Sequence, residues 1–297
     1  MYSLLQSISR WNYREMAECF LHLGAHRTGT TLLQEFMYKR RAAAEKHNIK
    51  FIEISECRDK RFLTGVIYRT PEGQSCPDKT HQERVFRALE SSLACGARVF
   101  LSEENILGTM EENLRSKELY PSVTRSITRL GNSVKLFDTV CLSIRPPHEW
   151  WLSAIRYLAQ KGVMPSELLA ASREMNPSEH KWSRVVSEIA DVFPHARLVI
   201  RDFPSFLSNP KRQLREFTNW PEIKTLKNIE AKKSNSSTLG KQLLASSNAA
   251  GILNGRFNDQ VLREHELSYL EDLDRIRELV RGRGRLIAPC RAGEVKE

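Results

Sequence analysis

Short apolar runs alternate with segments of helical periodicity over the first two thirds of the chain. Runs of apolar, β-branched or aromatic residues predict strands at 18–24, 49–54, 98–102, 139–144 and 197–201. Apolar residues at helical spacing predict helices at 30–47, 81–95, 111–131, 148–161, 178–193 and 210–217. The strand runs lack alternation between apolar and polar positions, which is typical of strands buried on both faces.

This alternation predicts an α/β protein with a central parallel β-sheet flanked by helices on both sides. We expect a single domain over residues 1–297, with the α/β core at about 18–221 and a helical C-terminal part at about 222–297. Within that part, the short Arg-Gly tail at 281–285 is expected to be a solvated, frayed end rather than an RNA-binding element. Residues 57–79 carry scattered Gly and Pro in a polar setting and predict a long loop.

Composition narrows the class of protein and of partner. Apolar residues make up 40% of the chain and charged residues 28%, as in soluble globular proteins. The net charge of +10 favours anionic partners such as nucleotides or acidic glycans. The six cysteines form no CxxC pair, so we expect no zinc site and a reducing compartment. Because no signal peptide or membrane-spanning run is evident, the protein is expected to be cytoplasmic.

A glycine-rich turn follows the first predicted strand and suggests a phosphate site. The strand ends at Gly24, Gly29 follows five residues later, and a helical pattern then begins. The first N–H groups of such a helix are unpaired, and together with the helix dipole they attract an anion. Arg27 adds a cation, while Thr30 and Thr31 add hydroxyl donors.

The same turn departs from the GxxxxGK[ST] motif of nucleoside triphosphatases. Thr30 stands at the lysine position, and the cation of the loop is Arg27. No apolar strand ends in the aspartate that would hold magnesium, since 98–102 leads into Glu-Glu and 139–144 into Arg145. The loop therefore predicts phosphate binding without Mg-ATP, although a P-loop kinase stays an alternative.

Residues 22–34 read His-Leu-Gly-Ala-His-Arg-Thr-Gly-Thr-Thr-Leu-Leu-Gln. This segment resembles the 5′-phosphosulfate loop of the sulfotransferases that use 3′-phosphoadenosine 5′-phosphosulfate (PAPS), especially their bacterial branch, with Arg27 in place of the commoner lysine. The resemblance implies a P-loop NTPase-like three-layer α/β/α fold, and a role for Arg27 at the bridging oxygen and the departing 5′-phosphate. The loop residues that it assigns to the cofactor are His26, Arg27, Thr28, Gly29, Thr30 and Thr31.

A second segment, Arg-Pro-Pro-His-Glu-Trp-Trp-Leu-Ser, is similar to the family's 3′-phosphate site. Arg145 leaves a strand, and Ser153 follows eight residues later, inside the next helix. At 1.5 Å per residue the serine lies roughly 9 Å along that helix, so a long arginine and a short serine can meet at one phosphate. The alternative is a strand-capping arginine and an unrelated helix serine.

Transfer of a sulfuryl group also requires a general base for the acceptor. Glu104 follows the strand expected beside the central one and lies in Ser-Glu-Glu-Asn, which resembles the Ser-x-Glu-Asn segment of bacterial members. Glu103 is the rival, His26 is a weaker candidate, and a purely structural carboxylate is the further alternative. Fixed cations and backbone donors can replace magnesium for PAPS, so no metal is expected.

The adjacent Trp150 and Trp151 could contact adenine but are more typical of a helix core, and residues 232–238 lie where the family places a loop over the nucleotide. The leading hypothesis is a PAPS-dependent sulfotransferase that releases adenosine 3′,5′-bisphosphate (PAP). Its acceptor would carry a hydroxyl or amine, and an anionic acceptor or a glycan is compatible with the charge; nucleic acid is not expected. A catalytically inactive PAP- or polyanion-binding module is the non-enzymatic alternative.

Overall fold

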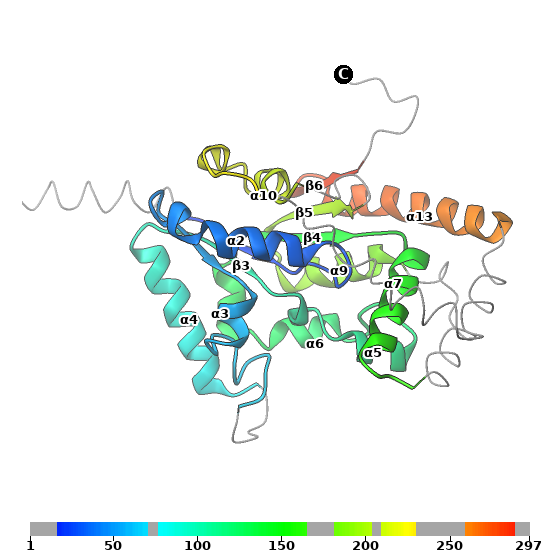
Figure 1. Ribbon diagram of the computed structural model, residues 1–297, viewed down its shortest axis with the longest axis horizontal. Helices are drawn as coiled ribbons and strands as arrows, with labels where there is room; N and C mark the ends of the chain where they lie inside the picture. The colour runs from blue at the N-terminus through cyan, green and yellow to red at the C-terminus, as the bar shows by residue number, and fades with distance from the viewer. Residues whose placement is uncertain (1–16, 71–76, 165–180, 204–208, 230–258, 289–297) are drawn as a thin grey trace, which may run out of the picture.

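The computed structural model describes residues 17–70, 77–164, 181–203, 209–229 and 259–288. In these residues six strands form one all-parallel sheet of order β2-β3-β1-β4-β5-β6 (Figure 1). The strands are β1 (Cys19–His22), β2 (Ile49–Ile52), β3 (Arg98–Ser102), β4 (Thr139–Ile144), β5 (Arg197–Asp202) and β6 (Gly284–Ile287).

Helices cover both faces of the sheet. The α-helices are α2 (Thr30–Glu45), α3 (Ile54–Arg58), α4 (Lys79–Ala94), α5 (Met110–Ser116), α6 (Val123–Thr128), α7 (Pro147–Gln160), α9 (Trp182–Val192), α10 (Pro210–Thr218) and α13 (Asp259–Val280). The shorter 3-10 helices are η1 (Glu104–Ile106), η2 (Gly131–Leu136) and η5 (Pro221–Lys224). None of the helices in the described part of the chain has the length and apolarity needed to cross a bilayer.

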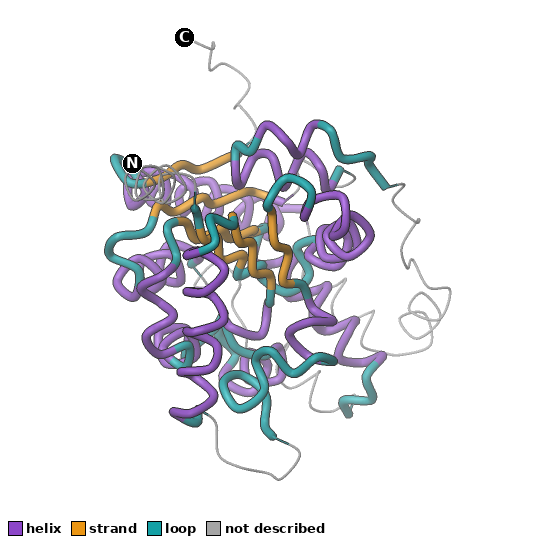
Figure 2. The backbone as a smooth tube through the Cα atoms, turned by 90° about the vertical axis from the view of Figure 1, so that its left-hand side faces the viewer, coloured by secondary structure: helices purple, strands orange, loops and turns teal. Residues whose placement is uncertain are grey.

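Alternate residues of the strands build two separate cores. Along β1, Cys19 and Leu21 belong to one apolar cluster, which also takes residues from α4, α6, α9 and α13. Phe20 belongs to the other, smaller cluster, which takes Phe36 from α2 and Phe217 from α10. Figure 2 shows the strands in the centre of the molecule with helices around them. Successive residues of a strand point to opposite faces, so a sheet covered on both sides needs apolar residues at every position.

The sheet order sets where a ligand can approach. β1 is central and pairs with β3 on one side and β4 on the other, both in parallel. The chain leaves β1 toward α2 on one face and leaves β4 toward α7, whose first turn begins with Pro147. Loops that diverge from adjacent parallel strands leave a crevice at the carboxyl edge of the sheet, where α/β proteins bind ligands.

The expected α/β fold with a parallel sheet between helices is confirmed. The strands predicted at 98–102 and 139–144 coincide with β3 and β4, and the predicted helices at 30–47 and 148–161 correspond to α2 and α7. Trp150 and Trp151 are buried in the larger cluster, as a helix core requires. Cys19 and Cys141 are buried free thiols.

The prediction for the C-terminus was wrong in one respect. The helical part expected at 222–297 contains a strand, because residues 284–287 form β6 and pair with β5. Gly284 and Arg285 therefore lie in the sheet, although 281–285 was predicted to be a frayed end. The run Gly-Arg-Leu-Ile is too short and too charged to show strand periodicity, and its strand conformation depends on the open edge of β5.

The loop predicted at 57–79 is also shorter than expected at its start. Helix α3 extends to Arg58, capped at its N-terminus by Glu53, whose side chain accepts from the N–H of Ser55. Residues 71–76 of that predicted loop, and the predicted nucleotide-covering loop at 232–238, lie outside the described residues.

Replacement of Gly284 by alanine is expected to weaken the docking of β6. A Cβ atom at this position would lie 1.9 Å from the carbonyl oxygen of Leu198, so the two strands could not keep their register. Forcing such a contact costs about 1–3 kcal/mol. Urea unfolding should show this loss for Gly284→Ala and a change below about 0.5 kcal/mol for the exposed control Arg281→Ala. Equal stability of the two variants would contradict the close approach.

Candidate functional site

The loop between β1 and α2 passes through left-handed backbone conformations. The φ angle is +37° at Gly24, +65° at Arg27 and +79° at Gly29. A Cβ atom on Gly24 would lie 2.4 Å from Cγ2 of Thr30, and one on Gly29 would lie 2.5 Å from a ring carbon of Phe203. Both glycines are thus required by backbone conformation and by space.

The start of α2 has the features of an anion site. Gly29 is its N-cap, no side chain among the described residues caps it, and its first turn holds no acidic residue. The first N–H groups of the helix therefore remain available for a ligand at the positive end of its dipole. An oxyanion placed at this end would accept these hydrogen bonds.

The three loop threonines have different surroundings. Thr28 is buried, and its hydroxyl donates to the carbonyl oxygen of Ala25 at 2.5 Å. The hydroxyl of Thr30 donates to Oε2 of Glu104 at 2.6 Å, while Thr31 is exposed on the first turn of α2. Thr28 therefore stabilises the loop itself, and Thr30 connects the loop to the end of β3.

Residues of the two predicted phosphate motifs meet beside this loop. Nε of Arg27 donates to Oγ of Ser153 at 2.9 Å, and Nη1 of Arg145 donates to the carbonyl oxygen of Arg27 at 3.1 Å. Burial, and after it the charge of Arg145, lowers the pKa of Arg27. Two guanidinium groups held this close repel each other, so an anion that contacts both would be stabilised by both.

Arg145 is fixed at the end of β4. Its Nη2 pairs with Glu149 at 2.5 Å, and its guanidinium lies over the ring of Phe203. The indole N–H of Trp182 donates to its carbonyl oxygen at 2.7 Å. Its Nε is buried and has no hydrogen-bond partner among the described residues. A buried unpaired donor on a charged group is costly, which fits a site whose acceptor is supplied by a ligand.

His26 stabilises the loop through a network of hydrogen bonds. Its backbone N–H donates to the hydroxyl of Tyr120 at 2.8 Å, and its Nδ1 lies 2.9 Å from the same oxygen. Its Nε2 lies 3.0 Å from Oδ1 of Asn105, whose amide nitrogen donates to the hydroxyl of Tyr68. Since Oδ1 can only accept, Nε2 carries the proton and Nδ1 accepts from Tyr120. Both ring nitrogens of His26 therefore have protein partners.

The two adjacent glutamates at the end of β3 have different environments. The side chain of Glu103 is 0% exposed and pairs with Nη2 of Arg58 at 2.7 Å. It also accepts from Nε of Arg58 and from the N–H of Asn105. The side chain of Glu104 is 18% exposed, accepts from Thr30 and lies 3.7 Å from the same guanidinium. Glu103 is thus a buried structural carboxylate, whereas Glu104 contacts the phosphate loop and reaches solvent.

Asp202 adds a buried carboxylate at the same edge of the sheet, at the end of β5. The hydroxyl of Tyr269 in α13 donates to its Oδ1 at 2.9 Å. Burial raises the pKa of Asp202 to about 6, against the hydrogen bond from Tyr269, and the charge of Glu149 raises it further. Glu149 is in turn the partner of Arg145, so this carboxylate belongs to the surroundings of the arginine pair.

The sequence predicted that the loop after β1, Arg145, Ser153 and the two glutamates lie together, and the structure brings them to the same carboxyl edge of the sheet. The sequence did not identify Arg58, Tyr68 or Tyr120, whose hydrogen bonds fix the residues at this edge. Arg58 and Tyr68 lie in a segment predicted as loop, and Tyr120 follows no motif, so no pattern of residues indicated them. A group of three or more metal-ligating side chains is not found among the described residues.

No protein-family model matches this chain, and no curated protein or solved structure is significantly similar to it.

The carboxyl group of Asp202 should make stability depend on pH. The folded protein keeps the proton of this carboxyl group up to about pH 6, whereas the unfolded chain releases it near the ordinary pKa of 3.8. The folded state thus binds more protons between these values, and stability falls as the pH rises through them. Asp202→Asn keeps an acceptor for Tyr269 without a charge. The free energy of unfolding of this variant at pH 7 should therefore exceed that of the parent protein by about 1–3 kcal/mol.

Urea unfolding of both proteins at about pH 4 and pH 7 tests this expectation. The difference in the free energy of unfolding should nearly vanish at the lower pH, because both side chains are then uncharged in the folded state. A difference of the same size at both pH values would contradict the raised pKa.

Proposed function

We propose that this protein is a sulfotransferase that moves the sulfuryl group of PAPS to a hydroxyl or amine of an acceptor and releases PAP. The observation that carries the proposal is the convergence of Arg27, Arg145 and Ser153 beside the uncapped start of α2. PAPS has phosphate groups at both its 5′ and its 3′ position, so it requires two anion sites in one crevice. A nucleoside triphosphate would need only the first of them.

In this proposal the two phosphate groups of PAPS bind to different residues. The N–H groups at the start of α2 and the guanidinium of Arg27 hold the 5′-phosphosulfate. Arg145 and Ser153 hold the 3′-phosphate, for which the unpaired Nε of Arg145 is a suitable donor. The ring of Phe203 lies against Gly29 and under the guanidinium of Arg145. It leaves no space for a side chain at position 29.

The chemical step is an in-line substitution at sulfur. The acceptor oxygen or nitrogen forms a bond to sulfur while the bond from sulfur to the 5′-phosphate oxygen breaks, and its electron pair leaves with PAP. The charge that develops on this oxygen lies next to Arg27 and the helix start. The proton lost by the acceptor goes to a carboxylate, and no metal ion is required for the charge balance.

Glu104 is the carboxylate that we assign as the general base. Its hydrogen bond from Thr30 holds it beside the phosphate loop, and it is accessible to an acceptor. A base must reach the proton that it removes, within about 3 Å or through one water. Glu103 lacks that access, because it is buried and its oxygens already bind Arg58 and Asn105.

PAP is expected to stabilise the protein against heat without magnesium, and Arg145→Ala should remove about half of this effect or more. A ligand at one hundred times its Kd stabilises by about 2.7 kcal/mol, and losing a bidentate charge-assisted contact should raise Kd by about tenfold or more. Differential scanning fluorimetry with and without EDTA measures both, with the exposed Arg125→Ala as control. Absence of stabilisation by PAP, or stabilisation by ATP only with magnesium, would overturn the proposal in favour of a kinase or another class.

Glu104→Gln is expected to abolish transfer and to leave PAP binding intact. Removing a general base costs about 10²- to 10⁴-fold in rate. The measurement is the formation of ³⁵S-labelled product from labelled PAPS with a panel of hydroxyl and amine acceptors, glycans included.

The matched variant is Glu103→Gln, which should lower stability because Arg58 loses its charged partner, yet retain transfer. Loss of transfer in Glu103→Gln alone, with PAP binding intact, would move the base to Glu103. Binding of PAP with no labelled product from any acceptor would instead support a catalytically inactive binding module.

A further inference from the structure

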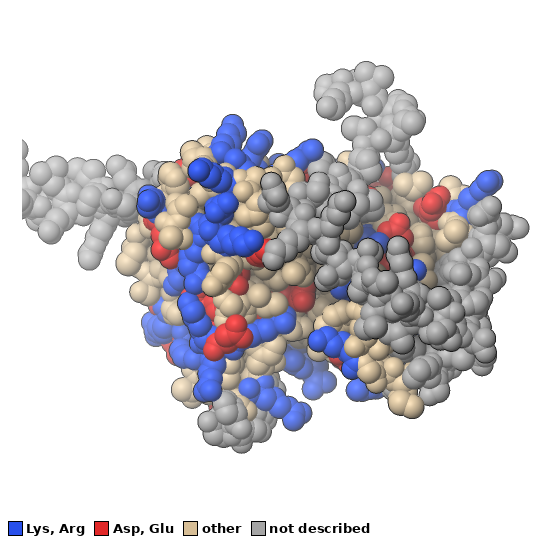
Figure 3. Space-filling model, in the orientation of Figure 1, with Lys and Arg blue, Asp and Glu red and all other residues tan. Residues whose placement is uncertain are grey.

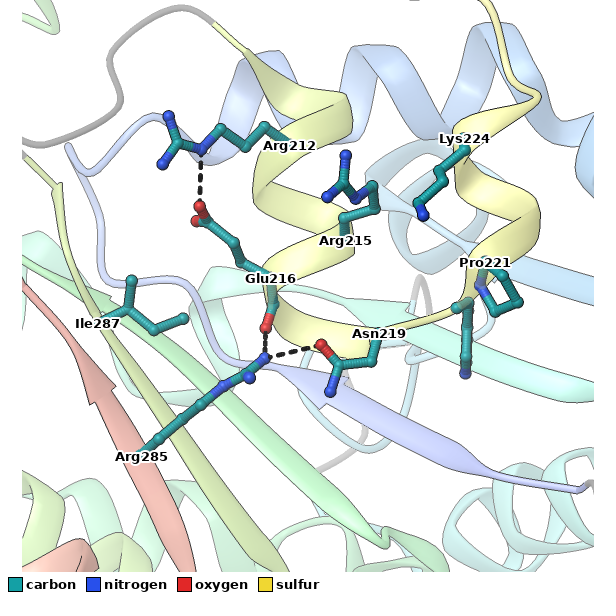
Figure 4. Close-up of a pocket in the computed structure, with 9 residues that line it drawn as sticks. Arg212, Arg215, Glu216, Asn219, Pro221, Lys224, Arg285 and Ile287 are labelled. Atoms are coloured by element: carbon teal, nitrogen blue, oxygen red, sulfur yellow. Dashed lines mark hydrogen bonds and ion pairs between the residues drawn. The ribbon is translucent and has the colours of Figure 1, made fainter. Parts of the chain in front are cut away.

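A second cationic pocket lies away from the phosphate loop, where α10, η5 and the edge strand β6 meet (Figure 4). It has a volume of about 730 Å³ and is open to solvent on one side. None of its lining residues belongs to the β1–α2 loop, to β4 or to α7. The pocket is lined by Arg212, Arg215, Glu216, Asn219, Trp220, Pro221, Lys224, Arg285 and Ile287.

The lining is strongly cationic, with four basic side chains and one carboxylate. That carboxylate, Glu216, already accepts from Arg212 at 2.8 Å and from the buried Arg201 at 3.2 Å. Its charge is therefore shared between one arginine of the pocket and one beneath it. Among the described residues it forms no ion pair with Arg215, Lys224 or Arg285.

Two of the cations have no partner of their own. Among the described residues, neither the guanidinium of Arg215 nor the ammonium of Lys224 has a hydrogen bond or ion pair, and Figure 4 draws the two side by side. They come from α10 and η5, whose backbones are tied together because Lys211 donates to the carbonyl oxygen of Lys224 at 2.6 Å. The two charges are thus held near each other by rigid elements without any internal acceptor.

Arg285 forms the floor of the pocket and is itself fixed. Its Nη2 donates to the carbonyl oxygen of Glu216 and to Oδ1 of Asn219, the latter at 3.2 Å. Its Nε is buried without a hydrogen-bond partner among the described residues. Burial, and then the charge of Arg197, lowers the pKa of Arg285. A pocket with clustered cations and an unsatisfied buried donor on one of them is arranged for an anion.

The surface around the pocket has the same sign. Lys and Arg side chains gather over α2 and α10 on the face shown in Figure 3. Arg40 of α2 donates to the carbonyl oxygens of Lys227 and Asn228, which follow η5, and among the described residues it has no carboxylate partner. An anionic ligand would therefore be attracted toward the pocket from the surrounding surface as well.

We propose that this pocket is a second anion-binding site, for a small ligand that carries two or more phosphate or sulfate groups. Arg215 and Lys224 bind one such group, and Arg285 with Arg212 binds another. Ile287 and Pro221, on opposite sides of the pocket in Figure 4, provide apolar contacts for the carbon skeleton of the ligand. The site is independent of the proposed transferase activity, because it shares no residue with the crevice of Arg27 and Arg145.

Isothermal titration calorimetry with two probes tests this site and separates phosphate from sulfate recognition. The probes are inorganic tripolyphosphate and sucrose octasulfate. Each is titrated into the parent protein, into Arg215→Gln/Lys224→Gln, and into the matched control Arg125→Gln/Lys135→Gln. The control removes one exposed arginine and one exposed lysine from α6 and η2, which lie against the opposite face of the sheet. Arg145→Ala reports any binding in the other crevice.

We expect at least one probe to bind the parent protein with one site that Arg145→Ala retains. Arg215→Gln/Lys224→Gln should weaken it by about tenfold or more, since two charge-assisted hydrogen-bond donors are lost. The control pair should change Kd less than about twofold, because its charges lie across the sheet from the pocket and are screened by salt. Both substituted residues are exposed, and their side chains have no partner in the described part of the chain, so folding should be retained, as circular dichroism can verify.

Three results would overturn the inference. The first is that neither probe binds the parent protein. The second is that the control pair weakens binding as much as the pocket pair does. The third is that Arg145→Ala abolishes binding. The second result would indicate attraction by net charge alone, and the third would assign the anion to the other crevice. These measurements use neither PAPS nor an acceptor. A negative result would therefore leave the proposed transferase function untouched, and loss of that function would leave this inference untouched.

Discussion

The central constraint in this structure is the close approach of two positive side chains beside the free start of a helix. Arg27 and Arg145 come from loops that leave neighbouring strands. The guanidinium of Arg145 donates to the carbonyl oxygen of Arg27, and the guanidinium of Arg27 donates to the hydroxyl of Ser153. Without an anion, this arrangement concentrates like charge and leaves Nε of Arg145 unpaired. Like charges held together and a buried unpaired donor both lower the stability of the fold. We interpret this cost as preorganisation for a polyanion.

The rest of the crevice maintains that constraint. Gly24 and Gly29 allow the backbone to turn where any other residue would clash. His26 is held from both ring nitrogens, and Glu103 is held by Arg58, so the loop and the end of β3 form one connected hydrogen-bond network. Within that network Glu104 is the carboxylate with access to solvent. A rigid loop with one accessible base is the arrangement that the proposed in-line transfer needs.

Much of the fold and of the crevice could be predicted from the sequence, because the relevant signals are local. An uninterrupted apolar run such as 139–144 predicts a buried strand wherever it lies, and Gly24 and Gly29 with Arg27 predict an anion loop on their own. The contributions of Arg58, Tyr68 and Tyr120 could not be predicted, since each depends on a partner distant along the chain. β6 was missed for the same reason, because its strand conformation exists only against β5.

The sequence by itself therefore determined the class of fold and the glycine-rich turn between β1 and α2, since periodicity and glycine placement act over a few residues. Phosphate binding at this turn and at Arg145 stays a prediction. Only the tertiary structure decided which of two adjacent glutamates faces the loop, because side-chain direction at the end of β3 depends on what packs there. It also decided that Arg215, Lys224 and Arg285 line one pocket, although Arg285 lies 61 residues after Lys224 in the chain. Charges distant in sequence acquire a joint function only where the sheet brings them together.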